Sequence, residues 1–154
     1  MCARTAGRPA ARFKGVMHIK PVQAISYDYG LKHSQKSESD IVNINDSKEG
    51  LFLAISTTCE LGNDLVLEVS FEYTNGFRYL DEGDLIYYWQ SGIFDSAHHI
   101  YQITSGGWSN GEALEKGVLS IGSATNSKEW FVVTSNGCIN VLSNTVPQVR
   151  VKNA

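Results

Sequence analysis

Cysteine is scarce in this chain, and its cysteines are far apart. Cys2, Cys59 and Cys138 are the only three among 154 residues, and no Cys-x-x-Cys pair occurs. This excludes the dense cysteine framework of a small disulfide-stapled domain. It favours a reducing compartment, with the cytoplasm as the first expectation. A bridge between Cys59 and Cys138 stays open at this point.

Long apolar runs and catalytic motifs are also missing. No apolar run approaches the roughly 20 residues that a membrane-spanning helix needs. The sequence has no Gly-x-Ser-x-Gly elbow, no His-Glu-x-x-His pair and no glycine-rich phosphate loop. We therefore expect no membrane span and no enzyme of these classes, and we expect no cofactor.

Acidic residues are absent from the first 27 residues, which hold five of the 13 basic ones. The rest of the chain carries eight basic against 16 acidic residues, and the formal net charge is −3. That balance disfavours a nucleic-acid partner.

Residues 1–16 are rich in Ala, Arg and Gly and have no apolar segment of a secretory signal. We expect a disordered basic tail, or codons upstream of a start at Met17. A mitochondrial presequence is the alternative, although Pro9 and the lack of an apolar stripe disfavour it. Residues 17–154 are long enough for one domain with a sizeable core.

Short apolar runs between turn residues predict an all-β domain, because helical periodicity is almost absent. About ten short strands are expected, and the economical fold is a two-sheet β-sandwich of the jelly-roll type, with a closed barrel second. The expected strands are 17–28, 41–44, 51–58, 65–74, 85–90, 99–104, 117–122, 129–135, 137–142 and 148–152.

Two of these strands and two turns carry the strongest predictions. From Leu65 to Tyr73 apolar and polar residues alternate, which predicts one buried and one wet face. The run 85–90 reads as a central strand that opens after an acidic turn. Asn75-Gly76 and the Asn-Gly pair at 136–137 each predict a hairpin.

Metal ligands are present, but not in sufficient groups. His98 and His99 are adjacent, so on a strand they face opposite ways, and Asp95 with His98 gives only a partial ligand set. The acids at 81, 82 and 84 could bind Ca²⁺ but are better explained as an ordinary turn. We therefore predict no metal site.

Carbohydrate is the leading ligand class. Sugars are bound by aromatic faces under their C–H groups and by amide, carboxylate or imidazole groups at their hydroxyls. Loops on a rigid β scaffold are where such residues usually gather. The segment 95–110 supplies this mixture, and its candidate ligand-binding residues are Asp95, His99, Gln102, Trp108 and Asn110.

From Leu80 onward the chain carries, in this order, Glu82-Gly83-Asp84 with Ile86, Ser91-Gly92, Trp108, residues 117–122, Phe131-Val132-Val133, residues 137–141, Asn144 and Val149-Arg150-Val151. These features cover about half the chain, and their order resembles the bacterial galactophilic lectins, small jelly-roll domains that bind galactosides through calcium.

This resemblance implies site residues of its own. His99 and Gln102 resemble the family's sugar-contacting pair, and Asn144 to Pro147 resembles the start of its calcium loop. The family's calcium-binding aspartate corresponds to Thr145, and the asparagine pair that completes the loop has no counterpart. The resemblance thus implies galactoside binding with calcium lost.

We therefore expect a non-enzymatic, lectin-like module, with a glycan or glycoconjugate as partner and Asn144 as a sixth ligand-binding residue. The alternative is a jelly-roll assembly subunit of a capsid, appendage or toxin complex. Tyr88 and Trp89 would then lie in subunit interfaces of a homo-oligomer.

Overall fold

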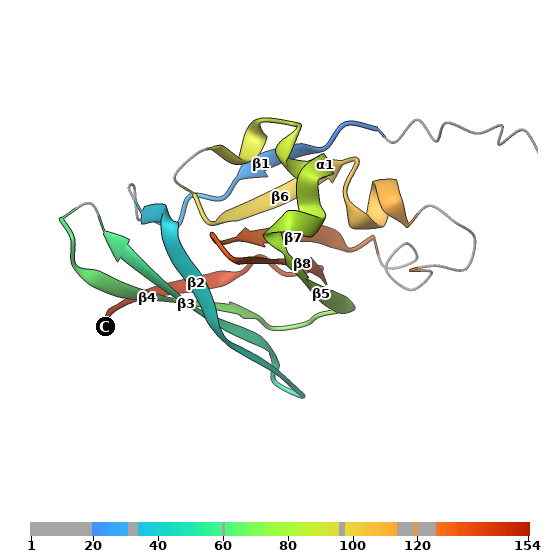
Figure 1. Ribbon diagram of the computed structural model, residues 1–154. Helices are drawn as coiled ribbons and strands as arrows, with labels where there is room; N and C mark the ends of the chain where they lie inside the picture. Colours follow the sequence, from blue (N-terminus) through green and yellow to red (C-terminus); the bar gives the residue numbers. More distant parts are fainter. Residues whose placement is uncertain (1–19, 31–33, 60, 96–97, 114–118, 120–125) are drawn as a thin grey trace, which may run out of the picture.

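The chain forms two antiparallel β-sheets with a short helical segment on the outside (Figure 1). The computed structural model describes residues 20–30, 34–59, 61–95, 98–113, 119 and 126–154. Its strands are β1 (Gln23–Ser26), β2 (Ser34–Ser47), β3 (Gly50–Cys59), β4 (Asp64–Phe71), β5 (Gly76–Asp81), β6 (Ile100–Ser105), β7 (Lys128–Val133), β8 (Gly137–Ser143) and β9 (Gln148–Asn153). Its helical turns are η1 (Glu82–Leu85), α1 (Ile86–Trp89), η2 (Ile93–Asp95) and η3 (Trp108–Glu112).

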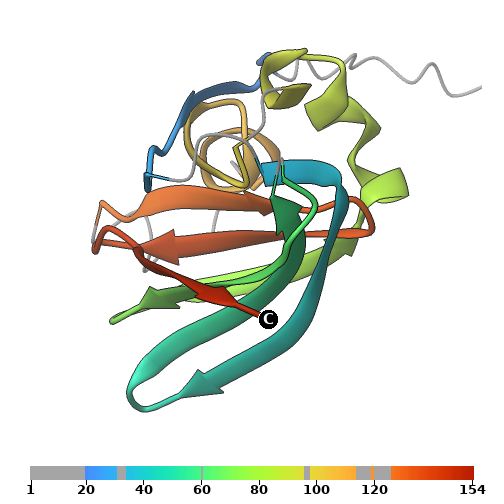
Figure 2. The ribbon, with the colours of Figure 1, turned by 90° about the vertical axis from the view of Figure 1, so that its left-hand side faces the viewer.

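The two-sheet sandwich is confirmed. Sheet A has the order β1-β6-β7-β8-β5, and sheet B has the order β2-β3-β4-β9 (Figure 2). In sheet A, β6, β7 and β8 are successive antiparallel neighbours and β5 lies beside β8, which is a Greek key. In sheet B, β2, β3 and β4 form a meander. The strands that the structure describes therefore contain one Greek key, where a jelly roll has two.

Alternating side chains build the core between the sheets. Leu51, Leu53 and Ile55 on β3 are at most 1% exposed, and so are Leu67 and Val69 on β4. They pack against Ile100, Trp130, Val132, Ile139 and Val141 of sheet A. The predicted alternation is confirmed up to Phe71, where β4 ends. Tyr73 lies beyond the strand and is 67% exposed, because the chain there leaves sheet B.

The helical segment 82–95 covers the other face of sheet A and corrects the prediction of a strand at 85–90. Asp81 caps the first turn, and its carboxylate accepts the Gly83 amide at 2.9 Å. Leu85 and Tyr88, three residues apart, are buried, whereas Ile86 is 63% exposed. That spacing is helical, and a continuous apolar run alone does not distinguish a helix from a buried strand. Tyr88 is buried within its own chain and so is not a subunit interface.

Asn75-Gly76 does not make a hairpin, because the chain crosses there from sheet B to sheet A. The Asn75 amide donates to Leu142 O at 2.8 Å and so joins the start of β5 to β8. The second Asn-Gly hairpin is confirmed, since Val133 and Cys138 are paired across it. The strand expected at 41–44 is longer than predicted, because β2 runs from Ser34 to Ser47. Of the strand expected at 117–122 only residue 119 is described, so this prediction is not tested.

The segment 20–22 is held against the end of β6. The Tyr87 hydroxyl lies between two carbonyl oxygens that can accept its hydrogen, Lys20 O at 2.8 Å and Gly106 O. Gly106 has φ +71°, and a Cβ there would lie 2.4 Å from Lys20 O and from Pro21 O. Only glycine fits this crossing.

Cys59 and Cys138 are separate free thiols. Among the described residues, the helices are too short to cross a bilayer.

Candidate functional site

Sheet A has two ends, and the predicted site residues are divided between them. At the crossover end β6 and β8 end and β5 and β7 begin; at the hairpin end the Val133–Cys138 pair closes the sheet. Asp95 and His99 precede β6 at the hairpin end, whereas Trp108 and Asn110 follow it at the crossover end. A six-residue strand separates them by roughly 20 Å.

Two predicted residues at or near β6 are placed unfavourably for a dissolved ligand. His99 is 0% exposed, and its Nδ1 lies 3.1 Å from the Tyr29 hydroxyl. Gln102 is half-buried in the middle of β6, paired with Trp130 of β7. For Asp95 only the backbone is described, and it closes η2. These residues do not form one surface with Trp108.

Asn110 and Trp108 belong to the turn η3. The Asn110 side chain accepts the Gly107 amide at 3.1 Å and donates to Thr104 O at 3.3 Å, so its amide holds its own turn. The Arg78 guanidinium lies 5.0 Å from the centre of the Trp108 ring, a cation–π contact. One face of the predicted stacking platform is therefore already occupied.

Glu129 is the residue that holds this turn on sheet A. It is 1% exposed, and its carboxylate accepts the amides of Trp108 at 3.0 Å and Ser109 at 2.8 Å. It also accepts the Ser109 hydroxyl at 2.9 Å and Asn140 Nδ2 at 2.7 Å. At Gly107 a Cβ would lie 2.7 Å from the same carboxylate. A buried carboxylate is stable only with such partners.

Arg78 and Glu112 extend these contacts to the edge strand β5. Arg78 makes two 2.7 Å bonds to the Glu112 carboxylate, and its Nε donates to Asn140 Oδ1 at 2.9 Å. Its Nη2 also donates to the Tyr88 hydroxyl at 3.2 Å. We call Arg78, Tyr88, Glu112, Glu129 and Asn140 the carboxylate network.

Charge and burial in the carboxylate network shift three pKa values. The hydrogen bond from Arg78 lowers the pKa of Glu112, although burial opposes it. Burial, with the charges of Glu129 and Glu112, raises the pKa of Tyr88. Burial alone would lower the pKa of Arg78, but the hydrogen bond and charge of Glu112 outweigh it and raise that pKa. Each shift favours the protonation state that the contacts require, so the network is a structural clamp.

Sequence reasoning missed the carboxylate network. Glu129 is the second residue of β7, a largely apolar strand, and a single acid at the start of such a strand usually points to solvent. The sign of its burial is its position: Glu129 lies on the same face of β7 as Phe131, and Phe131 is paired with the buried Asn140 of β8. Among the described residues, no group of three or more His, Cys, Asp or Glu side chains is arranged to hold a metal ion.

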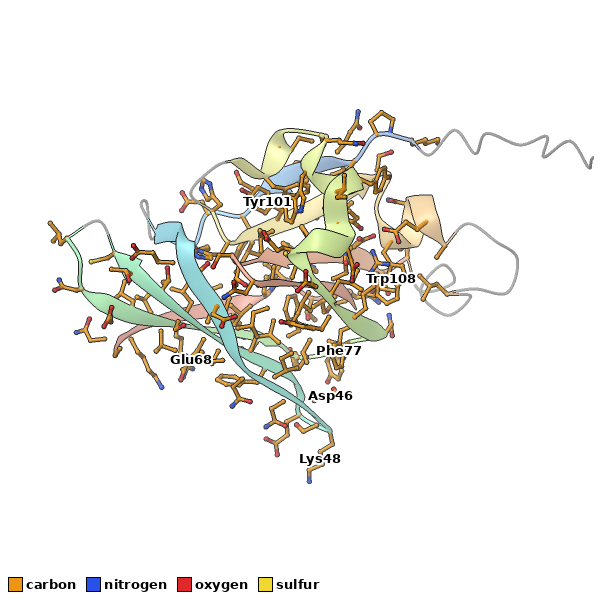
Figure 3. All side chains as sticks on the ribbon, in the orientation of Figure 1. Asp46, Lys48, Glu68, Phe77, Tyr101 and Trp108 are labelled. Carbon is orange, nitrogen blue, oxygen red and sulfur yellow. The ribbon has the colours of Figure 1, made fainter. Side chains whose placement is uncertain are left out.

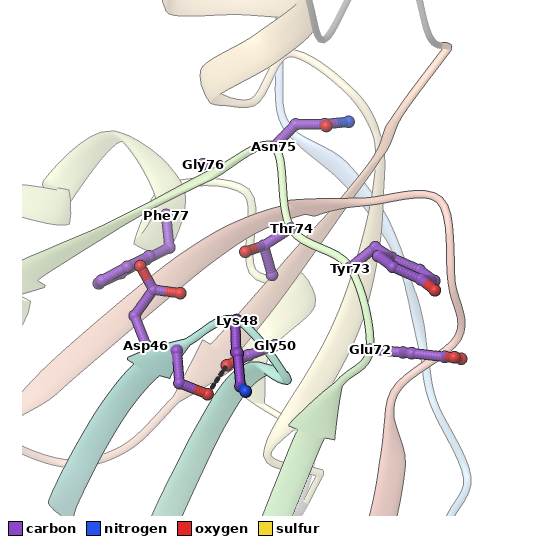
Figure 4. Close-up of a pocket in the computed structure, with 10 residues that line it drawn as sticks. Asp46, Lys48, Gly50, Glu72, Tyr73, Thr74, Asn75, Gly76 and Phe77 are labelled. Carbon is purple, nitrogen blue, oxygen red and sulfur yellow. Dashed lines mark hydrogen bonds between the residues drawn. The ribbon is translucent and has the colours of Figure 1, made fainter.

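A groove at the crossover end is the candidate binding site (Figure 4). Its volume is about 460 Å³, and it lies between the β2–β3 turn and the crossover into β5. It is lined by Asp46, Ser47, Lys48, Gly50, Glu72, Tyr73, Thr74, Asn75, Gly76 and Phe77. Phe77 and Asp46 lie on one side, Glu72 and Tyr73 on the other, and Lys48 between them (Figure 4).

Two predicted residues lie next to this groove. A Cβ built on Gly76 would be 3.8 Å from the Trp108 ring, so that ring backs the groove wall. Trp108, Phe77 and Asp46 lie toward the same side of the molecule, away from Glu68 (Figure 3). Asn144 is exposed and follows Ser143, whose hydroxyl donates to Tyr73 O. The crossover end thus unites Trp108 and Asn144 with residues that sequence reasoning did not select.

Comparison with known proteins adds no relative, since no protein-family model, curated protein or solved structure matches the chain.

Proposed function

We propose that this protein is a non-enzymatic carbohydrate-binding module whose ligand occupies the groove at the crossover end. The observation that carries the proposal is the exposed Tyr73 ring, 67% accessible, at the margin of a groove that is also lined by acidic residues and a lysine. An aromatic face packs against sugar C–H groups, and carboxylates accept hydrogen bonds from sugar hydroxyls.

The charges of the groove favour an uncharged, hydroxyl-rich ligand. Asp46 and Glu72 are opposed by Lys48, and all three side chains are exposed. Carboxylates accept and an ammonium donates, so both halves of a hydroxyl group find partners. The volume, about 460 Å³, lies within the range of small-ligand pockets.

Galactosides are the first ligands to test, because the C-terminal half resembles galactophilic lectins. We propose that binding is independent of calcium, since Thr145 replaces an aspartate of the calcium loop. Asn144 and Trp108 contribute from the rim and the wall, and the residues at the hairpin end do not contribute.

The experiment is a glycan array with the full chain, followed by calorimetry on any glycan that binds, with and without a chelator. Tyr73→Ala should weaken binding at least about tenfold, as expected when an aromatic anchor is lost. Tyr79→Ala is the matched control, because Tyr79 is also an exposed tyrosine, 48% accessible, but does not line the groove.

Absence of binding to every glycan would refute the proposal, as would equal loss in both tyrosine variants. Incubation with bound oligosaccharides tests the non-enzymatic part, because paired carboxylates are the groups that glycosidases use. Release of new reducing ends would contradict that part.

A further inference from the structure

Tyr73 lies on the crossover segment 72–75, between two fixed points of the backbone (Figure 4). The first point is the contact of the β2–β3 turn with the end of β4. Gly50 in that turn has φ +113°, and a Cβ there would lie 2.0 Å from Phe71 O. The second point is the bond from the Asn75 amide to β8, at 2.8 Å. Neither contact includes Tyr73, so its place along the groove depends on a further contact.

A buried hydroxyl group supplies that contact. Ser143 is the last residue of β8 and is 0% exposed. Its hydroxyl donates to Tyr73 O, a carbonyl oxygen that can only accept. A serine hydroxyl has one hydrogen and two lone pairs, so after this bond it can still accept two hydrogen bonds. Ser143 thus ties the backbone of Tyr73 to the crossover end of sheet A.

Thr145 supplies both of the bonds that the Ser143 hydroxyl can accept. Its amide donates to Ser143 Oγ at 3.1 Å, and its own hydroxyl oxygen lies 2.9 Å from the same atom. The single hydrogen of Ser143 is directed at Tyr73 O, so the Thr145 hydroxyl is the donor of this pair. Consecutive hydrogen bonds polarise and strengthen one another. We call this path from Thr145 through Ser143 to Tyr73 O the hydroxyl chain.

We infer that Ser143 and Thr145 are positioning residues of the groove, which fix the backbone of Tyr73 before a ligand arrives. The inference rests on the proposed function, because it gives both residues a role in binding through Tyr73. Neither residue is among those that line the groove, so neither acts by touching the ligand. A binding residue that is already held in place loses less conformational freedom on binding, and affinity rises accordingly.

Thr134 offers a matched control at the other end of sheet A. It lies in the hairpin between β7 and β8 and is 3% exposed. Its hydroxyl donates to Gly137 O at 2.6 Å and accepts the Gly137 amide at 3.2 Å. Thr134→Val and Thr145→Val therefore each remove one bonded hydroxyl, but only Thr145 belongs to the hydroxyl chain.

The first measurement is ¹⁵N nuclear magnetic resonance relaxation of the full chain without ligand. In wild type the backbone order parameters of residues 73 and 74 should be near about 0.85, as in rigid backbone. Ser143→Ala and Thr145→Val should lower them toward about 0.6, whereas Thr145→Ser, which keeps the hydroxyl, and Thr134→Val should not. Unchanged order in Ser143→Ala overturns the inference.

The second measurement is calorimetry with methyl β-galactoside, at a temperature where circular dichroism shows every variant to be folded. Ser143→Ala should bind at least about fivefold more weakly than wild type, because a hydrogen bond that prepares the groove is lost. Thr134→Val should bind within about twofold of wild type, even where its melting temperature is lower. A Ser143→Ala variant that is less stable but binds as tightly as wild type has lost only a structural bond, and that result also overturns the inference.

The two proposals fail separately. If wild type binds neither this galactoside nor any glycan of the array, the proposed function fails. The order parameters of residues 73 and 74 then still decide whether the hydroxyl chain holds this side of the groove. If wild type binds and Ser143→Ala binds equally well, the proposed function stands and the positioning role of Ser143 falls.

Discussion

Replacing Glu129 with alanine tests whether the carboxylate network clamps the turn η3. The side chain is 1% exposed and accepts five hydrogen bonds, two of them from the backbone amides of Trp108 and Ser109. Removing it leaves the two backbone amides without this acceptor, and Asn140 Nδ2 keeps only its bond to the Tyr88 hydroxyl. Breaking a buried charged network costs about 3–5 kcal/mol, and the loss of volume acts in the same direction.

Urea unfolding, followed by far-ultraviolet circular dichroism, measures this cost. For a chain of 154 residues the expected loss lowers the melting temperature by roughly 6–20 °C. Glu129→Gln keeps the shape but places a donor against the Ser109 amide, so it should be less harmful than alanine yet clearly destabilising.

Glu72→Ala is the matched control, since this acid is exposed and lies outside the network. Its unfolding free energy should stay within about 0.5 kcal/mol of wild type. If Glu129→Ala costs less than about 1 kcal/mol, the carboxylate is not a clamp, and the assignment of a structural role to the network fails.

Other perturbations give separate tests. Arg78 lowers the pKa of Glu112, so their ion pair stabilises the fold fully above the pKa that the carboxyl has in the unfolded chain. This stability is lost as the pH falls through the lowered pKa of the folded state. In denaturant titrations, Glu112→Gln should therefore be less stable than wild type at neutral pH and equally stable in strong acid. Gly106→Ala should cost at least about 2 kcal/mol, because φ is +71° and the new Cβ would lie 2.4 Å from two backbone carbonyl oxygens; a variant as stable as wild type would contradict the crossing. At Gly137 a Cβ would lie 2.2 Å from the Tyr79 hydroxyl, at the far end of a long, exposed side chain. Gly137→Ala should therefore displace the Tyr79 ring and lower the unfolding free energy by less than about 1.5 kcal/mol, and Tyr79→Ala/Gly137→Ala should be no less stable than Tyr79→Ala. A larger loss in Gly137→Ala would show that the Tyr79 ring is fixed.

The sandwich was predictable because its two central strands in sheet B obey a simple period. Leu51, Leu53 and Ile55 face the core and alternate with half-buried residues, and β4 repeats the pattern. Such alternation has one physical reading, a strand with a single buried face. The hairpin predicted at the Asn-Gly pair 136–137 was correct because the two strands that flank it, β7 and β8, are neighbours in one sheet.

The helical segment and β2 were not predictable from pattern alone. The run 85–89 is apolar at nearly every position, so neither period is visible, and the cap at Asp81 was the one local sign of a helix. β2 is polar over most of its length because it is an edge strand whose residues 42–47 are exposed. The polar composition of β2 therefore predicted a loop where the structure has most of a strand.

The candidate site was predicted by ligand chemistry and missed in location. Residues 95–110 are contiguous in sequence, but β6 carries their two ends to opposite ends of sheet A. The groove joins residues 46–50 to residues 72–77, and that contact exists only because the chain changes sheets near Asn75. The residues around Asn75 do not by themselves predict that the chain crosses from one sheet to the other.

The bidentate bond between Arg78 and Glu112 has a mechanical consequence for sheet A. β5 is an edge strand and would be expected to peel away first, yet the turn that follows β6 reaches across to it. Separating β5 from β8 therefore also requires loss of that charged bond. In hydrogen exchange, the amides of β5 should open together with those of β7 and β8, whereas β9, paired on one side only, should fray on its own.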